Sequence, residues 1–145
     1  MKDFDKEKDK TALDEFFGPV ISIYSRAQAI ADGILVDVSS MALEAGFKLP
    51  VAITRAAWKD CVEWSEQDNS AQVYQDESGR LWDVLFMAYY AICTSRETGD
   101  RLHFSLYRVP KDGSSAEAEE VSLKLIVGPG DSAESVVTIL LPDES

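Results

Sequence analysis

The sequence predicts one α+β domain, in which an antiparallel β-sheet packs against three to four helices. Three stretches near the C-terminus alternate apolar and polar residues and are joined by short links, as consecutive antiparallel strands are. Upstream of them, residues 84–93 form an uncharged apolar run that is too long to lie exposed and too short to cross a bilayer. This run predicts a core helix that buries Leu85 and Phe86, and 145 residues suffice for one domain with a sizeable core.

The N-terminus differs in composition from the rest of the chain. In residues 1–10, four lysines alternate with four acidic residues, and Phe4 is the one large apolar side chain besides the initiator. Such a segment cannot bury enough apolar surface to fold, so residues 1–12 are expected to be a disordered charged arm and residues 13–145 the domain. The first elements expected in the domain are a turn of helix over residues 13–17 and a strand over residues 20–24.

Capping residues divide the next part of the chain. Ser25 can begin a helix that Gly33 ends, and Ser39 or Ser40 can begin a second helix that Gly46 ends. These signals and the apolar spacing predict a helix over 26–32, a strand over 34–39, helices over 41–45 and 55–67, and a polar loop over 67–71.

A hairpin is expected just before the apolar run. Gly79 can adopt the positive φ of a tight turn, so the two residues before Glu77 and the three residues after Gly79 are expected to pair as strands. Asp83 would then cap the buried helix. The alternative is a single helix over residues 80–96, capped by Ser78.

Three strands are expected to form a meander at the C-terminus, over residues 101–109, 121–127 and 135–141. The last of them has apolar residues on both faces, so it should lie in the centre of the sheet or be covered on both sides. The helices must then pack on one face of the sheet.

The charge balance is unusual. The chain has 26 acidic and 14 basic residues and a formal net charge of −12, and because the charges of the first ten residues cancel, all of it falls on the domain. A surface this negative argues against direct nucleic-acid binding. Two interpretations stay open: a solvated surface that keeps the protein soluble, or a negative face that competes for a basic, nucleic-acid-binding surface on a partner protein.

The second interpretation has a candidate face. Between Asp60 and Glu77 the sequence contains acidic residues but no Lys or Arg. Aromatic residues among these acids are candidates for the apolar anchors that a specific interface needs. The candidate partner-binding residues are the acids Asp60, Glu63, Glu66, Asp68, Asp76 and Glu77, with Trp64 and Tyr74 as anchors.

No catalytic motif is recognisable. His103 is the only histidine and falls on the polar face of an expected strand; no Cys-x-x-Cys or Gly-x-Ser-x-Gly is present, and residues 128–131 lack the lysine of a phosphate loop. We therefore expect no enzyme activity, no metal and no cofactor. The alternatives are a divalent-metal-dependent hydrolase that uses Asp37, Asp60 or Asp83, and a small-molecule binder with an aromatic-lined site.

Two further observations concern the compartment. Cys61 and Cys93 lie in apolar stretches, which favours buried free thiols in a reducing compartment over a disulfide. No signal peptide is recognisable, because residues 1–12 contain no apolar stretch. We expect a cytoplasmic protein that does not bind membranes and is a monomer or a homodimer.

Three phrases together resemble a known family. They are residues 21–33 (ISIYSRAQAIADG), 73–85 (VYQDESGRLWDVL) and 123–131 (LKLIVGPGD). The sequence is similar, over residues 19–143, to a family of small bacterial proteins of unknown function that are often carried on plasmids, phages and other mobile elements. The resemblance implies no catalytic residues. It implies a context in which small acidic proteins inhibit host defence, as anti-restriction and anti-CRISPR proteins do.

Overall fold

The computed structural model describes residues 2–4, 7–8, 24–96 and 99–144. The helical turn expected over residues 13–17 lies outside these ranges, and so does all but the last residue of the strand expected next to it. Near the N-terminus, β1 (Lys2–Phe4) and β2 (Glu7–Lys8) pair antiparallel with each other. The division of the chain into an arm and a domain stays a prediction.

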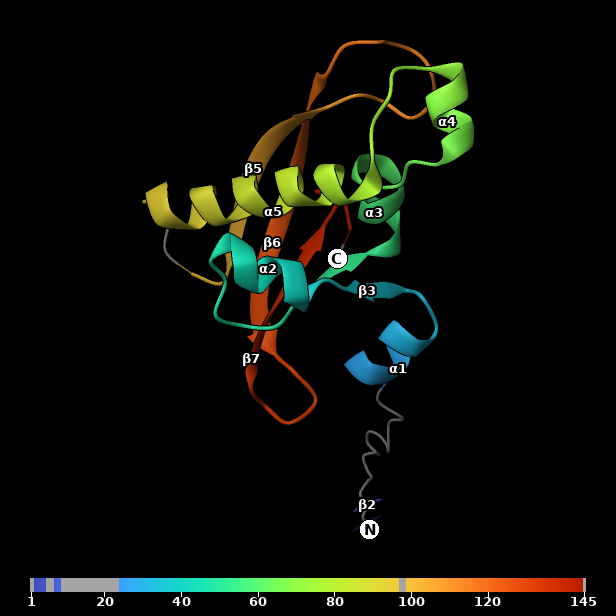
Figure 1. Ribbon diagram of the computed structural model, residues 1–145. Helices are drawn as coiled ribbons and strands as arrows, with labels where there is room; N and C mark the ends of the chain where they lie inside the picture. Colours follow the sequence, from blue (N-terminus) through green and yellow to red (C-terminus); the bar gives the residue numbers. More distant parts are fainter. Residues whose placement is uncertain (1, 5–6, 9–23, 97–98, 145) are drawn as a thin grey trace.

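The remaining elements form one sheet with helices against it (Figure 1), which confirms the α+β class. The helices are α1 (Arg26–Ala31), α2 (Ser39–Ala45), α3 (Arg55–Cys61), α4 (Glu66–Ala71) and α5 (Glu77–Thr94). The strands are β3 (Leu35–Asp37), β4 (Val51–Thr54), β5 (Arg101–Arg108), β6 (Glu119–Pro129) and β7 (Ser135–Leu140).

The sheet has the strand order β3-β4-β7-β6-β5 and is mixed. The C-terminal meander is confirmed: β5 pairs antiparallel with β6 and β6 with β7. β7 is the middle strand, as its two apolar faces predict. The expectation of a purely antiparallel sheet was wrong, because β4 runs parallel to β7 and has no counterpart among the expected strands.

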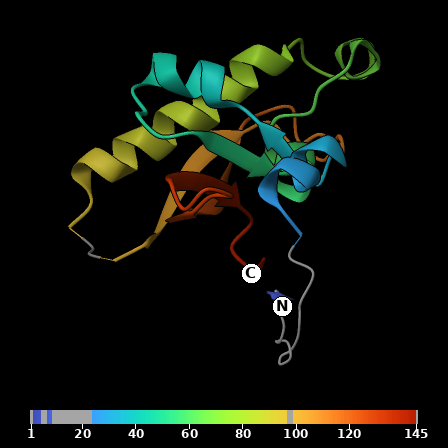
Figure 2. The ribbon, with the colours of Figure 1, turned by 90° about the horizontal axis from the view of Figure 1, so that it is seen from below.

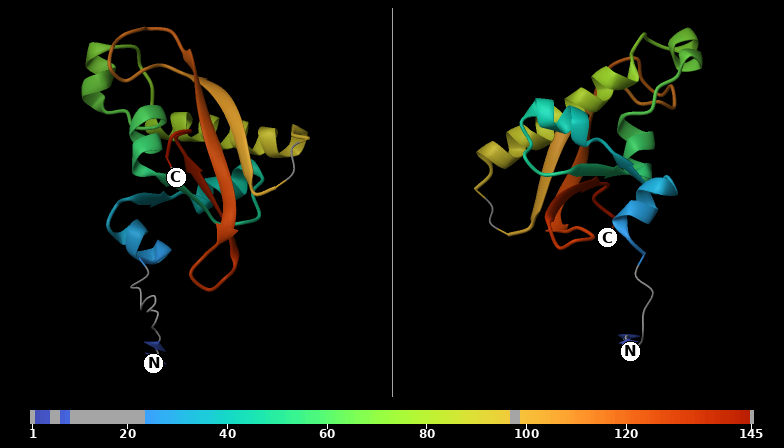
Figure 3. Two further views of the ribbon diagram at one scale, coloured as in Figure 1. Left: turned by 180° about the vertical axis from the view of Figure 1, so that it is seen from behind. Right: turned by 60° about the horizontal axis from the view of Figure 1, so that its bottom comes forward.

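One face of the sheet carries the core. Figure 2 shows α2 and α5 side by side over this face, and α3 packs against β4 and β7. Leu85 of α5 is fully buried there, together with Ile53 of β4 and Ile139 of β7. His103 of β5 is exposed and its neighbour Phe104 is buried, as the strand alternation predicts. Figure 3 shows the sheet from behind.

The prediction of a hairpin before the apolar run was wrong, because α5 is one continuous helix from Glu77 to Thr94. The Asp76 carboxylate caps it by accepting a hydrogen bond of 2.6 Å from the backbone N–H of Gly79. Neither Asp83 nor Ser78 is the cap, since both lie inside the helix. The alternative of a single helix is nearer to the structure. A good N-cap followed by an acidic first turn outweighs one glycine in that turn.

Two other helix boundaries differ from the expected ones. The helix expected over residues 55–67 ends at Cys61, and the expected polar loop is α4, which begins with a capping box between Ser65 and Asp68. Ser39 lies in the first turn of α2, where its hydroxyl donates to the Asp37 carboxylate. The Ser25 capping box of α1 is confirmed.

The cysteines give a testable contrast, because Cys61 is buried and Cys93, against expectation, is exposed. Burial raises the pKa of the Cys61 thiol to about 12, so this thiol stays protonated at pH 8. We expect a disulfide reagent at pH 8 to modify one thiol per native chain rapidly, and both thiols in denaturant. The rapid reaction should disappear in Cys93→Ser and persist in Cys61→Ala; rapid modification of both thiols in the native protein would contradict the burial of Cys61.

Candidate functional site

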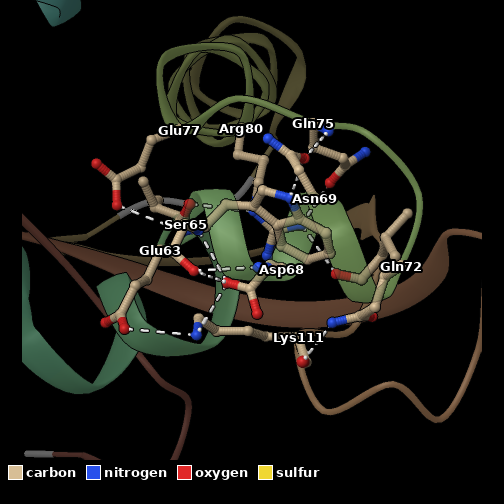
Figure 4. A network of polar contacts seen from close by, with 12 residues as sticks. Glu63, Ser65, Asp68, Asn69, Gln72, Gln75, Glu77, Arg80 and Lys111 are labelled. Carbon is tan, nitrogen blue, oxygen red and sulfur yellow. Dashed lines mark hydrogen bonds and ion pairs between the residues drawn. The ribbon is translucent and has the colours of Figure 1, made fainter.

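The acidic segment lies at one end of the molecule, where α3 ends, α4 forms and the chain enters α5 (Figures 1 and 4). Its side chains differ in exposure. Glu66, Asp76 and Glu77 are exposed, and Tyr74 is 77% exposed. The three acids Asp60, Glu63 and Asp68 are partly buried, and Trp64 is buried. The eight candidate residues therefore share a region of the fold but do not form one uniform surface.

Two cations from distant parts of the chain reach this region. Arg108 is the last residue of β5. Its Nη2 lies 3.0 Å from the Asp60 carboxylate, and its Nε donates a hydrogen bond to the Asp60 backbone carbonyl. Lys111, just after β5, places Nζ 3.1 Å from Asp68 and 3.6 Å from Glu63 (Figure 4). The segment contains no Lys or Arg along the sequence. Among the residues that the structure describes, however, three of its six carboxylates have a cationic partner.

The carboxylates also hold the local structure together. The backbone N–H of Ser65, and then Lys111, keep the pKa of Asp68 below its ordinary value, while Asp68 raises the pKa of Lys111. Glu77 accepts a hydrogen bond from the backbone N–H of Trp64 at 3.3 Å. With the cap made by Asp76, these contacts give most of the predicted acids a structural role. Glu66 accepts a hydrogen bond of 3.4 Å from the Asn69 side chain.

Trp64 cannot serve as an exposed anchor, because it is only 6% exposed. Its indole Nε1 donates to Asn69 Oδ1 at 2.8 Å, and its ring lies 4.6 Å from the guanidinium carbon of Arg80. Asn69 Oδ1 also accepts from the backbone N–H of Gln75, so the tryptophan ties α4 to the segment that leads into α5. Trp64 is thus buried in this structure, and the prediction that the acidic segment contacts a partner stays a prediction.

Exposed aromatic side chains lie instead on α5. Trp82, Phe86 and Tyr90, spaced four residues apart, are 37%, 50% and 54% exposed, and we call them the aromatic stripe. The rings of Trp82 and Phe86 stack with their centroids 6.4 Å apart. The apolar run was expected to be buried all round. The helix is instead amphipathic, with one buried and one exposed face. The four-residue spacing of its aromatic residues in the sequence could have predicted that they share one face.

An apolar groove opens beside the C-terminal half of α5. Its volume is about 330 Å³, and it lies between Tyr89 and Ile92 of the helix and Leu125 and Val137 of the sheet, with Phe47 from the chain after α2. A groove of this kind is the usual form of a small-molecule site. If the protein binds a small molecule at an aromatic-lined site, this groove, with Phe47 and Tyr89 in its lining, is a candidate for that site.

Two of the three carboxylates considered for metal chemistry have other contacts. Asp37 accepts from Ser39, and Asp60 pairs with Arg108. Across the described ranges, no group of three His, Cys, Asp or Glu side chains is placed to hold a metal ion. In the same ranges, no helix combines the length and apolarity needed to cross a bilayer.

Fold and surface together define a small acidic α+β domain with a helix that presents aromatic side chains to solvent. The chain belongs to a family of unknown function, DUF6573, whose match covers residues 13–145. Comparison with curated proteins and with solved structures found no match. The expected family of unknown function is thus confirmed, and the association with plasmids and phages stays a prediction.

Proposed function

We propose that this protein is a binding protein, not an enzyme, and that it docks a basic partner protein on the aromatic stripe. The stripe carries the proposal. Its three side chains are partly exposed on consecutive turns of one helix. Burying them against a partner would be favourable, because it removes apolar surface from water. Large aromatic side chains supply much of the binding energy at protein interfaces.

Charge indicates the chemistry of the partner. Asp83 follows Trp82 and lies on the same outer face of α5, and Glu66 is exposed on α4. Within the described part of the chain, neither carboxylate has a Lys or Arg nitrogen within 4 Å. Together with the net charge of −12, they favour a partner whose apolar pocket is rimmed by Lys and Arg.

A surface that normally holds nucleic acid has this basic character. On this proposal the protein inhibits such a partner by occupying the surface, and no chemistry is required. The predicted acidic face is thereby revised: Glu66 and Tyr74 stay as contacts, and the stripe replaces Trp64 as the apolar anchor.

The proposal can be tested by capture from a bacterial lysate at low and at high salt, with wild type and two double variants. Trp82→Ala/Phe86→Ala removes most of the stripe, and Glu66→Gln/Asp83→Asn removes charge but keeps shape. We expect wild type to retain a basic protein at low salt and less of it at high salt, since charge attraction is screened over about 10 Å at 0.1 M salt. Both double variants should lose the same protein.

Leu43→Ala is the matched control, because Leu43 is exposed on α2, outside the stripe. It should capture what wild type captures. If all three variants retain the same proteins as wild type, the stripe is not the docking surface.

The apolar groove supports a second candidate function, small-molecule binding. Its lining is mostly apolar, so the affinity of a ligand there would depend little on salt. A ligand that binds wild type and the stripe variant equally, with no effect of salt, would favour this second function.

A further inference from the structure

The guanidinium of Arg80 is a buried charge that makes no direct salt bridge to any described residue. Arg80 is 5% exposed, in the first turns of α5. Nε donates to the carbonyl of Val62 at 3.1 Å, and Nη1 donates to Gln75 Oε1 at 2.6 Å and to the carbonyl of Val109 at 2.9 Å. All three partners are neutral.

The second terminal nitrogen of Arg80 is unsatisfied. Within the described ranges, Nη2 is buried and has no hydrogen-bond acceptor, and no carboxylate oxygen lies within 4 Å of the guanidinium. Burial lowers the pKa of Arg80, but a guanidinium stays protonated in proteins. A buried charge is costly unless it is paired, and each unmade hydrogen bond adds to this cost.

Arg80 lines a recess between α5 and β5. The recess measures about 110 Å³; one water molecule takes about 30 Å³ in the liquid, so a small group fits and a nucleotide does not. Arg108 is its second cation, and Gln75 and Tyr107 add polar side chains. Arg108 uses Nε and Nη2 on Asp60, and it also interacts with the Cys61 thiol in the same recess.

Two acidic groups also line the recess. The Cys61 thiol is neutral at physiological pH because burial raises its pKa to about 12. Asp83 lies at the rim, and its exposure leaves its carboxylate in contact with solvent. Arg108 is already paired with Asp60 beside the recess, so Arg80 is the cation in the lining that makes no salt bridge to a described residue.

We propose that this recess is a binding site for a small oxyanion, a free phosphate or a small carboxylate, held by Arg80 and Arg108. A planar guanidinium binds carboxylate and phosphate oxygens through parallel N–H donors, and such charge-assisted bonds are about twice as strong as neutral ones. An oxyanion would supply the acceptor that Nη2 lacks and would form a direct salt bridge with Arg80. This site contains none of the residues of the aromatic stripe, although it shares Asp83 with the proposed docking surface; it does not depend on the proposed partner.

The experiment is a titration of the full chain with inorganic phosphate and with acetate, in low-chloride buffer, followed by calorimetry and by the NMR signal of the Arg80 Nε–H. We expect saturable binding at one site for at least one of the two probes, with a shift of that signal. Binding of phosphate alone, or of acetate with equal or higher affinity, tells which oxyanion the site takes.

Two variants make the outcome decisive. Asp83→Asn removes a negative charge from the rim without touching the core, and it should tighten binding about fivefold. Arg80→Lys keeps the charge but loses the planar fork, and it should weaken binding at least about tenfold. If Arg80→Lys does not fold, the affinity of Asp83→Asn and the shift of the Arg80 NMR signal in wild type still test whether an oxyanion binds in the recess.

Three results would overturn the proposal. One is the lack of saturable binding of either probe to wild type, which would leave water as the partner of Nη2. Another is binding that neither variant changes, which would be a non-specific surface effect. The third is that Asp83→Asn destabilises the fold and abolishes binding, which would make Asp83 itself the counter-charge of Arg80.

Discussion

Leu85→Ala is expected to lower the free energy of unfolding by about 2–5 kcal/mol. Leu85 is fully buried between α5 and the sheet, in the same cluster as Ile53 and Ile139. Truncation removes apolar contacts and leaves a cavity that two packed layers cannot close. Chemical denaturation, with the midpoint and the slope compared with wild type, measures the loss.

Phe86→Ala is the control at the next position of the same helix. Phe86 is half exposed and stacks on Trp82, so its truncation should cost about 1 kcal/mol or less. The sequence placed both side chains in the core, and the structure separates them. Equal losses for the two variants would mean that α5 is buried on both faces, which would also remove the aromatic stripe.

The fold was predictable where one local pattern dominates. Alternating residues predicted the meander of β5, β6 and β7, and the Ser25 box predicted α1. β4 is four residues long and its first three are fully buried, so it has no alternation to recognise. The prediction of a hairpin failed because a glycine such as Gly79 is compatible with a tight β-turn and also with the first turn of a helix. The Asp76 cap decides between them.

The candidate site was predictable only in part, since charge pairing depends on tertiary contacts. The acidic segment holds no Lys or Arg, yet Arg108 and Lys111 reach it from a strand end that is remote in sequence. The burial of Arg80 could have been predicted from its position alone. It directly precedes Leu81 and lies one helical turn before Val84, so it falls on the core face of α5. Counting charges along a chain cannot show which of them are neutralised.

Gly46→Ala is expected to lower the free energy of unfolding by about 2–5 kcal/mol, through two separate effects. Gly46 ends α2 with φ +122°, a conformation that a residue with a Cβ rarely adopts. A Cβ at this position would lie 2.7 Å from Cζ of Tyr89, whose ring also packs edge-on against Phe47. The ring would have to move and disturb the contact between α2 and α5.

Gly33→Ala separates the two effects. Gly33 has φ +80°, but nothing lies within 4 Å of its Cβ position, so this variant should show the backbone cost alone, about 1–2 kcal/mol. The excess in Gly46→Ala then combines the crowding of Tyr89 with the larger backbone cost of φ +122°, which lies farther from the left-handed region. In a Tyr89→Ala background the crowding part should vanish, giving a favourable coupling in the double-mutant cycle. If Gly46→Ala costs no more than Gly33→Ala, the Tyr89 ring does not pack against the end of α2.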